Sequence, residues 1–341
     1  MVIGCRRSGI GLVELLAALG TVFILLGLAL PAIQQSRDAA RRTSCLSQLR
    51  QIGVGAQGFL ATRSYFPGPR VNALPSLSKY SSDSGLFIEL LPYLDQMSLH
   101  RQFDLNRFAH SPENRSLLVQ QPPLLKCPAT GETVRLSGIS SEISGSVVSG
   151  LESVTCDYSG SAGVWDFSSQ LDGRNGGIVR LRIGLQPGTK SSEVRDGLSN
   201  TLIAWESAGD GLYLPFDENV ARSFSDFAPD SFEWRERGGS FESIGRPSSL
   251  TYLYSWCGFR SGSLSAWSSS GEQLNPWFSQ GVVINRTNRF GEPFSRHFGG
   301  ANFANADGSV EFVSDRIDSK VLSCKVAIAD GTTAISIGGD E

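Results

Sequence analysis

One histidine and one aspartate near the carboxyl end are spaced as an acid/base pair could be. His297 is followed, after nine intervening residues, by Asp307 and Gly308. A histidine beside a carboxylate can exchange protons or complete a metal shell, and Asn302 or Asn305 could join them in one site. The simpler interpretation is structural. Asp307-Gly308 suits a type I′ turn in a β-hairpin, and His297 would then fasten a loop by hydrogen bonding.

The motifs that would mark an enzyme or a zinc knuckle do not occur in this sequence. There is no G-x-S-x-G, no H-E-x-x-H and no phosphate loop. No Cys-x-x-Cys or Cys/His cluster with zinc spacing appears, and His100 and His110 lack a partner at ligand spacing. We therefore expect no catalytic residues, no bound metal and no resident cofactor.

A long apolar run near the amino end contains a single charge. From Ile10 to Ile33 only Glu14 is charged. As a helix the run would be about 36 Å long, enough to cross a hydrocarbon core of ~30 Å. A carboxylate there costs roughly 2 kcal/mol or more unless it is paired, neutralised or close to the interface. A cut between Gly9 and Ile10 would create a terminal amine that could pair with Glu14 of the same or a neighbouring chain.

The segment RRSGIGLVELL, which begins at Arg6, resembles the leader and mature start of type IV prepilins and type II secretion pseudopilins. In that class a prepilin peptidase cuts after a glycine, the new amino terminus is methylated, and the fifth mature residue is glutamate. Gly9 and Glu14 match those positions, whereas Ile10 stands where phenylalanine is usual. The resemblance implies a leader over residues 1–9, processing between Gly9 and Ile10, and a role for Glu14 in assembly.

Two other interpretations of this segment stay open. A general secretory signal peptide also has a basic start and an apolar core, but this run is long and offers Leu30-Pro31-Ala32 where an A-x-A-like site is wanted. An ordinary uncleaved membrane anchor is the other alternative. Positive charges flank the run on both sides, so they do not fix its orientation.

Segments beyond the anchor resemble successive blocks of the DUF1559 family, prepilin-type proteins with a C-terminal H-x9-DG region that are greatly multiplied in planctomycete-like bacteria. In this chain that region covers residues 295–318. The other matching segments are residues 90–104, 124–130, 158–163 and 194–207. The resemblance implies a surface or envelope protein and no known biochemical activity.

Composition and patterning favour a β-rich body behind a long helix. The chain has 341 residues, and its 38 glycines favour many short strands and turns. Its net charge is -3, so the overall charge does not favour binding of nucleic acid. Residues 34–62 continue the helix in amphipathic form, and three glycines lower helical propensity toward its end near residue 60. The apolar positions of this stretch are Leu46, Leu49, Ile52, Ala56 and Phe59. The fold class expected is α+β, with a mostly antiparallel, pilin-like domain over residues 63–341.

The cysteines and aspartates add two expectations. The six cysteines are Cys5, Cys45, Cys127, Cys156, Cys257 and Cys324. A body outside the cytoplasm could form disulfides, and the best guess is Cys45 with Cys127, which would clip the helix to the body. Because major pseudopilins often bind Ca²⁺, a calcium ion is the one cofactor kept open, although no EF-hand loop is present. The aspartates available for it are Asp157, Asp172, Asp307, Asp315 and Asp318.

The sequence therefore predicts a single-pass protein of the inner membrane with its body on the extracytoplasmic side. Its expected partners are the membrane, a prepilin peptidase, and copies of itself or other pseudopilins. The alternative is an anchored module whose loops recognise a glycan, a peptide or an envelope protein. Its stacking surfaces would come from the tryptophans, although core packing is their commoner fate. These are Trp165, Trp205, Trp234, Trp256, Trp267 and Trp277.

Overall fold

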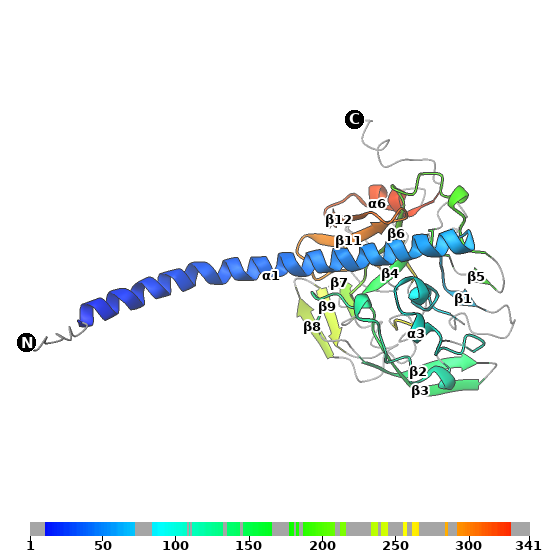
Figure 1. Ribbon diagram of the computed structural model, residues 1–341, viewed down its shortest axis with the longest axis horizontal. Helices are drawn as coiled ribbons and strands as arrows, with labels where there is room; N and C mark the ends of the chain where they lie inside the picture. The colour runs from blue at the N-terminus through cyan, green and yellow to red at the C-terminus, as the bar shows by residue number, and fades with distance from the viewer. Residues whose placement is uncertain are drawn as a thin grey trace, which may run out of the picture.

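The computed structural model consists of one long helix attached to a β-rich body (Figure 1). This arrangement confirms the α+β class expected from the sequence, with mostly antiparallel strand pairing. The structure describes residues 11–71, 84–107, 109, 111–131, 135–143, 146–165, 177–180, 182–183, 187–208, 212–215, 233–237, 240–244, 255–257, 261–265, 284–285 and 292–328.

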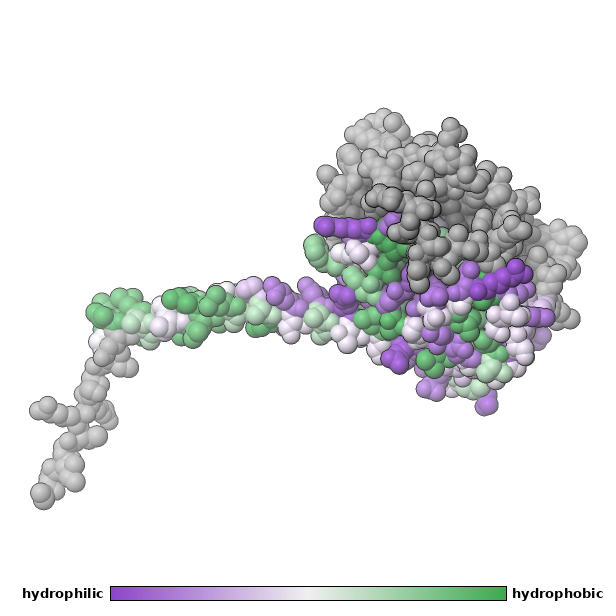
Figure 2. Space-filling model, turned by 90° about the horizontal axis from the view of Figure 1, so that it is seen from above, coloured by the Kyte–Doolittle hydropathy of each residue, from purple (hydrophilic) through white to green (hydrophobic). Residues whose placement is uncertain are grey.

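Helix α1 runs without interruption from Leu12 to Arg63 and passes through Pro31. Its first half, to Ile33, exposes apolar side chains along its whole length. Figure 2 shows this half as a mostly green rod that becomes purple as it nears the body. Within the part of the chain that the structure describes, α1 is the one helix long and apolar enough to cross a membrane, and an 18-residue stretch of it has a mean hydropathy of 2.4.

The second half of α1 is amphipathic and packs on the body, as the spacing of its apolar residues predicts. One face is buried and the other is exposed. Each large apolar side chain that is fully buried contributes about 1.5–3 kcal/mol to the free energy of unfolding, compared with the same side chain left exposed. The buried apolar residues form a stripe along α1, and this stripe is therefore a main attachment between helix and body. Its buried members are Cys45, Leu49, Ile52, Ala56 and Phe59.

A five-stranded sheet forms the centre of the body, in the order β10-β4-β6-β11-β12. Its strands are β4 (Tyr158–Trp165), β6 (Leu202–Glu206), β10 (Ser261–Ser265), β11 (Gly300–Asn305) and β12 (Val310–Ser314). Only the β10–β4 pair is parallel. Helix α1 packs against β6, β11 and β12, and helix α6 (Ser319–Val326) packs against β4 and β6. Each helix has its own apolar cluster with the sheet.

Smaller elements surround this sheet. Two further pairs are β1 (Arg70–Val71) with β5 (Arg182–Ile183), and β2 (Arg135–Ile143) with β3 (Ser146–Val154). A three-stranded sheet contains β7 (Leu212–Pro215), β9 (Ser240–Ile244) and β8 (Glu233–Arg237). The short helices are α2 (Leu86–Leu90), η1 (Leu91–Tyr93), α3 (Met97–His100), η2 (Pro112–Asn114), η3 (Pro123–Leu125) and η4 (Ser191–Glu193).

The glycines near the end of α1 are contact points with the body. A methyl group added at Gly53 would lie 3.0 Å from the Cα of Gly308, in the turn between β11 and β12. Glycine lets the two backbones approach this closely because it has no side chain. The close neighbours pair Gly53 with Gly308, Gly55 with Leu94 and Gly58 with Tyr93. The sequence predicts that these glycines weaken the helix. The structure shows in addition that they allow residues of the body to pack closely against the helix.

A disulfide joins the same helix to the body. It links Cys45 of α1 to Cys127, which is 82 residues further along the chain, with the two Cα atoms 5.4 Å apart. This is the pair proposed from the sequence. The other cysteines that the structure describes, Cys156, Cys257 and Cys324, are thiols.

The contact between Gly53 and the hairpin gives a stability prediction. We expect Gly53→Leu to lower the free energy of unfolding by about 1 kcal/mol, because overpacking costs about 1–3 kcal/mol and the gain in helix propensity offsets only ~0.8 kcal/mol of this cost. The matched control is Gln51→Leu, two residues away on the exposed face. Urea denaturation should show a change within about 0.5 kcal/mol for that control. Equal effects of the two substitutions would contradict the close packing at Gly53.

The disulfide gives a second prediction. Alkylation followed by non-reducing peptide mass spectrometry should find Cys45 and Cys127 linked. Replacing both by alanine should lower the free energy of unfolding by about 2–4 kcal/mol, since the bond closes a long loop in the unfolded chain. Cys324→Ala is the control and should leave stability almost unchanged. Alkylation of both Cys45 and Cys127 in the native protein would refute the pairing.

Candidate functional site at the junction of helix and body

The residues predicted for processing and assembly lie at the edge of the described structure. Gly9 and Ile10 fall outside the described residues. Glu14 lies in the first turn of α1, where only its backbone is described. Their roles therefore stay predictions.

The two ends of the H-x9-DG region lie at different places on the body. His297 precedes β11, and its Nε2 lies 3.3 Å from Oε1 of Glu206. Asp307 lies in the turn after β11, where its Oδ1 accepts hydrogen bonds from the backbone N–H and the hydroxyl of Ser309. The two side chains thus have different partners. Of the two asparagines, Asn302 belongs to the group around Glu206, and Asn305 bonds Ser309.

The hairpin predicted at Asp307-Gly308 is present, but its turn is of another type. A type I′ turn needs positive φ at both central residues. Among residues 305–309 only Gly308 has positive φ, at 86°, and its N–H bonds the carbonyl of Asn305. These features fit a three-residue loop that ends in a left-handed glycine. The type I′ prediction was wrong because the glycine is the third loop residue.

Glu206 is the centre of a buried polar group that the sequence did not reveal. It ends β6, and only 2% of its surface is exposed. Asn302 of β11 donates to both carboxylate oxygens, from its backbone N–H to Oε2 at 2.9 Å and from Nδ2 to Oε1 at 2.8 Å. With His297 on the same oxygen, the carboxylate has the partners that a buried acid requires. The available signal was a glutamate directly after the buried apolar run Leu202–Trp205.

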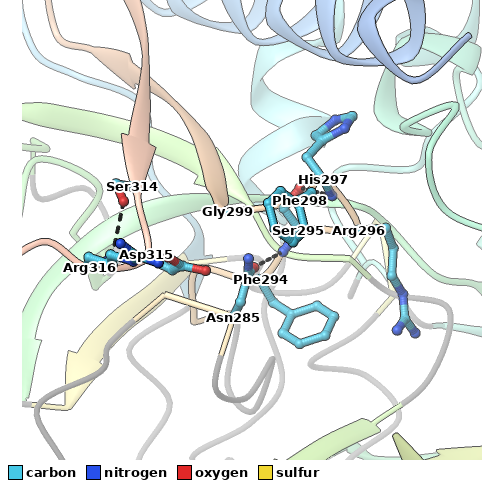
Figure 3. A pocket seen from close by; sticks show the side chains of 10 residues that line it. All are labelled: Asn285, Phe294, Ser295, Arg296, His297, Phe298, Gly299, Ser314, Asp315 and Arg316. Atoms are coloured by element: carbon cyan, nitrogen blue, oxygen red, sulfur yellow. Dashed lines mark hydrogen bonds between the residues drawn. The ribbon is translucent and has the colours of Figure 1, made fainter. Parts of the chain in front are cut away.

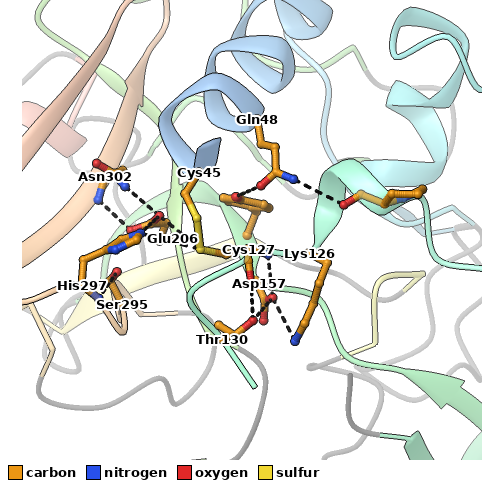
Figure 4. Close-up of a disulfide and its surroundings, with 12 residues drawn as sticks. Cys45, Gln48, Lys126, Cys127, Thr130, Asp157, Glu206, Ser295, His297 and Asn302 are labelled. Carbon is orange, nitrogen blue, oxygen red and sulfur yellow. Dashed lines mark hydrogen bonds and ion pairs between the residues drawn. A yellow bond between two sulfur atoms is a disulfide. The ribbon is translucent and has the colours of Figure 1, made fainter. Parts of the chain in front are cut away.

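This group lies against the disulfide (Figure 4). The sulfur of Cys127 is 3.7 Å from Nε2 of His297 and 3.8 Å from Oε1 of Glu206. The possible ligand atoms of these three residues and of Cys45 all lie within 4.8 Å of one another, and all four residues are buried. The sequence analysis predicts no metal site, because these four residues are far apart along the chain.

Cys127 is held from its other side by a second buried carboxylate. Oδ2 of Asp157 accepts hydrogen bonds from the backbone N–H of Cys127 and the hydroxyl of Thr130, and pairs with the ammonium of Lys126 at 3.3 Å. Asp157 was one of the aspartates considered for calcium. Because one of its oxygens already serves two donors and a cation, its role here is to fix the loop that carries Cys127.

Polar contacts also hold α1 in register. The buried phenol of Tyr158 donates to Oε1 of Gln48 at 2.7 Å. Burial raises the pKa of Tyr158 well above its ordinary value, and the nearby carboxylates raise it further, so the phenol keeps its proton. Further along the helix, Nε2 of Gln57 donates to the carbonyl of Ala306 in the hairpin turn.

An open pocket of about 740 Å³ lies beside the loop that carries His297. Phe298 is fully exposed at its edge. In Figure 3 the ring of His297 points toward α1, away from Asn285 and Asp315. The pocket is lined by Asn285, Phe294, Ser295, Arg296, His297, Phe298, Gly299, Ser314, Asp315 and Arg316.

The structure describes the side chains of two of the six tryptophans proposed as binding surfaces. Trp205 and Trp256 are fully buried in the body and serve as core residues. The side chains of Trp165 and Trp234, and the whole of Trp267 and Trp277, lie outside what the structure describes.

Comparison with known proteins places the chain in a family. A family model described as "Protein of unknown function (DUF1559)" matches residues 34–320, which is most of the chain. No curated protein and no solved structure matches. The match begins directly after the apolar run and includes both halves of the Cys45–Cys127 link, the Glu206 group and the H-x9-DG hairpin. Together with the apolar half of α1, this family fits a membrane-anchored envelope protein. The chain belongs to the DUF1559 family, as the sequence blocks predict.

Proposed function

We propose that this protein is a prepilin-like structural component of the cell envelope without enzymatic activity. Residues 10–33 would hold it in the inner membrane as a single pass. The observation that carries the proposal is the continuity of α1: one helix has an exposed apolar half and a half buried in the body. An exposed apolar rod about 30 Å long needs either lipid or neighbouring helices to cover it.

The disulfide supports an extracytoplasmic body. Disulfides form and persist in oxidising compartments, whereas the cytoplasm keeps most thiols reduced. The Cys45–Cys127 bond lies about 18 Å beyond Ile33 along the helix, at ~1.5 Å per residue. This places the bond outside the membrane when residues 10–33 lie within it.

Assembly would proceed through the apolar half of α1. After processing at Gly9, the amine of Ile10 in one chain would pair with Glu14 of a neighbour, so that neither charge stays uncompensated in lipid. The partners in this assembly would be copies of the same chain or other pseudopilins.

The arginines between the apolar half of α1 and the buried stripe have contacts within the chain. Arg42 packs over the ring of Phe312 of β12, whereas Arg41 pairs with Asp38 in solvent.

A second candidate function is an anchored binding module. It is favoured by the open pocket beside His297 and by the fully exposed Phe298 at the pocket's edge. A pocket lined by an exposed aromatic ring and by Arg296 and Arg316 suits a peptide, a glycan or another envelope protein.

The processing part of the proposal is tested on the native protein. Membrane fractions should contain a chain that starts at N-methylated Ile10, as read by amino-terminal mass spectrometry. A Gly9→Leu variant should keep residues 1–9, because the peptidase requires the glycine before the cut. A mature chain that starts after Ala32 would instead identify a secretory signal peptide, and an intact Met1 would identify an uncleaved anchor.

The assembly part is tested by Glu14→Gln. Losing the carboxylate leaves a neighbour's terminal amine unpaired at a cost of roughly 2.5–3.5 kcal/mol, so we expect assembled material to fall by about 100-fold. Cross-linking in membranes and electron microscopy of sheared fractions measure this. Thr21→Ala, in the same apolar run, is the control and should assemble normally. Normal assembly of Glu14→Gln would remove the role of Glu14, whereas absence of assembled wild-type protein would leave the binding module as the better explanation.

A further inference from the structure

The buried group at the helix junction has the composition of a transition-metal site. Cys45 and Cys127 offer sulfur, His297 offers an imidazole nitrogen and Glu206 a carboxylate oxygen, all within 4.8 Å of one another. Two sulfurs, one nitrogen and one oxygen suit zinc, and differ from the all-oxygen shells of calcium and magnesium. Because the four residues are drawn from α1, a loop, β6 and the segment before β11, only the folded chain assembles the set.

The spacing of three of these atoms matches a tetrahedral zinc site. With bonds of about 2.0–2.1 Å to nitrogen and oxygen and ~2.3 Å to sulfur, tetrahedral angles separate N from O by about 3.3 Å and S from N or O by about 3.6 Å. The observed separations are 3.3 Å between His297 Nε2 and Glu206 Oε1, 3.7 Å between Cys127 Sγ and Nε2, and 3.8 Å between Sγ and Oε1. These three ligand atoms are already arranged as they would be around the metal.

The fourth ligand, Cys45, is committed to the disulfide. In a zinc site its sulfur would lie about 3.8 Å from that of Cys127. The disulfide-bonded state and the metal-bound state of these two cysteines therefore exclude each other. From these observations we propose that Cys45, Cys127, Glu206 and His297 form a zinc-type metal site that is available when the disulfide is reduced, so that the junction is closed either by a sulfur–sulfur bond or by a metal ion.

The surroundings orient these ligands without the metal. Asn302 fixes both oxygens of Glu206 through two hydrogen bonds, and Asp157 holds the backbone N–H of Cys127. Such contacts are what keep metal ligands in place in known sites. His297 belongs to the loop that lines the open pocket, and its ring points from that loop toward α1 and the cluster (Figure 3).

The chemistry balances when a reductant is supplied. A protein dithiol outside the cytoplasm, or a phosphine in the laboratory, delivers two electrons, and the two sulfurs take up two protons. The dithiol becomes a disulfide, and the phosphine takes its oxygen from water. A divalent metal then displaces the two thiol protons, while His297 gives its neutral Nε2 and Glu206 its carboxylate.

Cobalt titration of the full chain in detergent tests this site. After anaerobic reduction with a phosphine, the protein should bind one Co²⁺ per chain with the strong visible absorption of tetrahedral thiolate coordination. Zn²⁺ should displace the Co²⁺ and raise the melting temperature of the reduced protein. The oxidised protein should do neither. His297→Gln and Glu206→Gln should each weaken binding at least tenfold, since even residues behind the ligands account for 10–100-fold.

Two control variants separate this site from the other thiols. Cys324→Ser and Cys156→Ala leave all four ligands in place and should bind Co²⁺ like the wild type. Circular dichroism of the oxidised His297→Gln protein shows whether that variant keeps the fold. Failure of the reduced wild type to bind Co²⁺, or unchanged binding by a folded His297→Gln protein, overturns the proposal, as does loss of binding in Cys156→Ala. None of these outcomes depends on processing at Gly9 or on assembly.

Discussion

The burial of one face of α1 between Cys45 and Phe59 is the interaction on which the rest of this structure depends. The central sheet presents β6 and β11 to this face, and the two elements share one apolar cluster. Without the helix, that side of the sheet would be exposed to water. The second half of α1 is therefore part of the core of the body, and the helix is not a separate element attached to a complete domain.

Polar contacts around the stripe determine how the helix lies on the sheet. A displacement by one turn would separate Gln48 from Tyr158, Gln57 from Ala306 and Gly53 from Gly308. Apolar packing alone tolerates such shifts, whereas hydrogen bonds and a close glycine contact do not. The H-x9-DG region takes part at both ends, since His297 lies beside the disulfide and Gly308 lies against the helix. Both ends of this region therefore contact α1 or the disulfide that joins it to the body.

Local patterns were enough to predict α1 and the β11–β12 hairpin and too little to predict the buried site. The period of apolar residues predicted α1, and Asp307-Gly308 predicted the hairpin, because both signals lie within a few residues of one another. The Glu206 group combines residues 45, 127, 206 and 297, whose proximity depends on how α1, β6 and β11 pack. The close contacts of Gly53 and Gly55 were missed for the same reason. The effect of these glycines on helix propensity can be read from their own positions in the sequence. Their packing partners, Gly308 and Leu94, are distant in the sequence.

The position of the disulfide determines how the protein carries mechanical load. Along α1, Cys45 is the first buried residue that follows the apolar half. A pull on the amino end of α1 therefore reaches a covalent bond before it reaches the stripe from Leu49 to Phe59. The tension passes through Cys127 into the body, and the weaker contacts further along the helix are shielded from it. Tension applied at the amino end of α1 therefore does not peel the second half of the helix from the sheet.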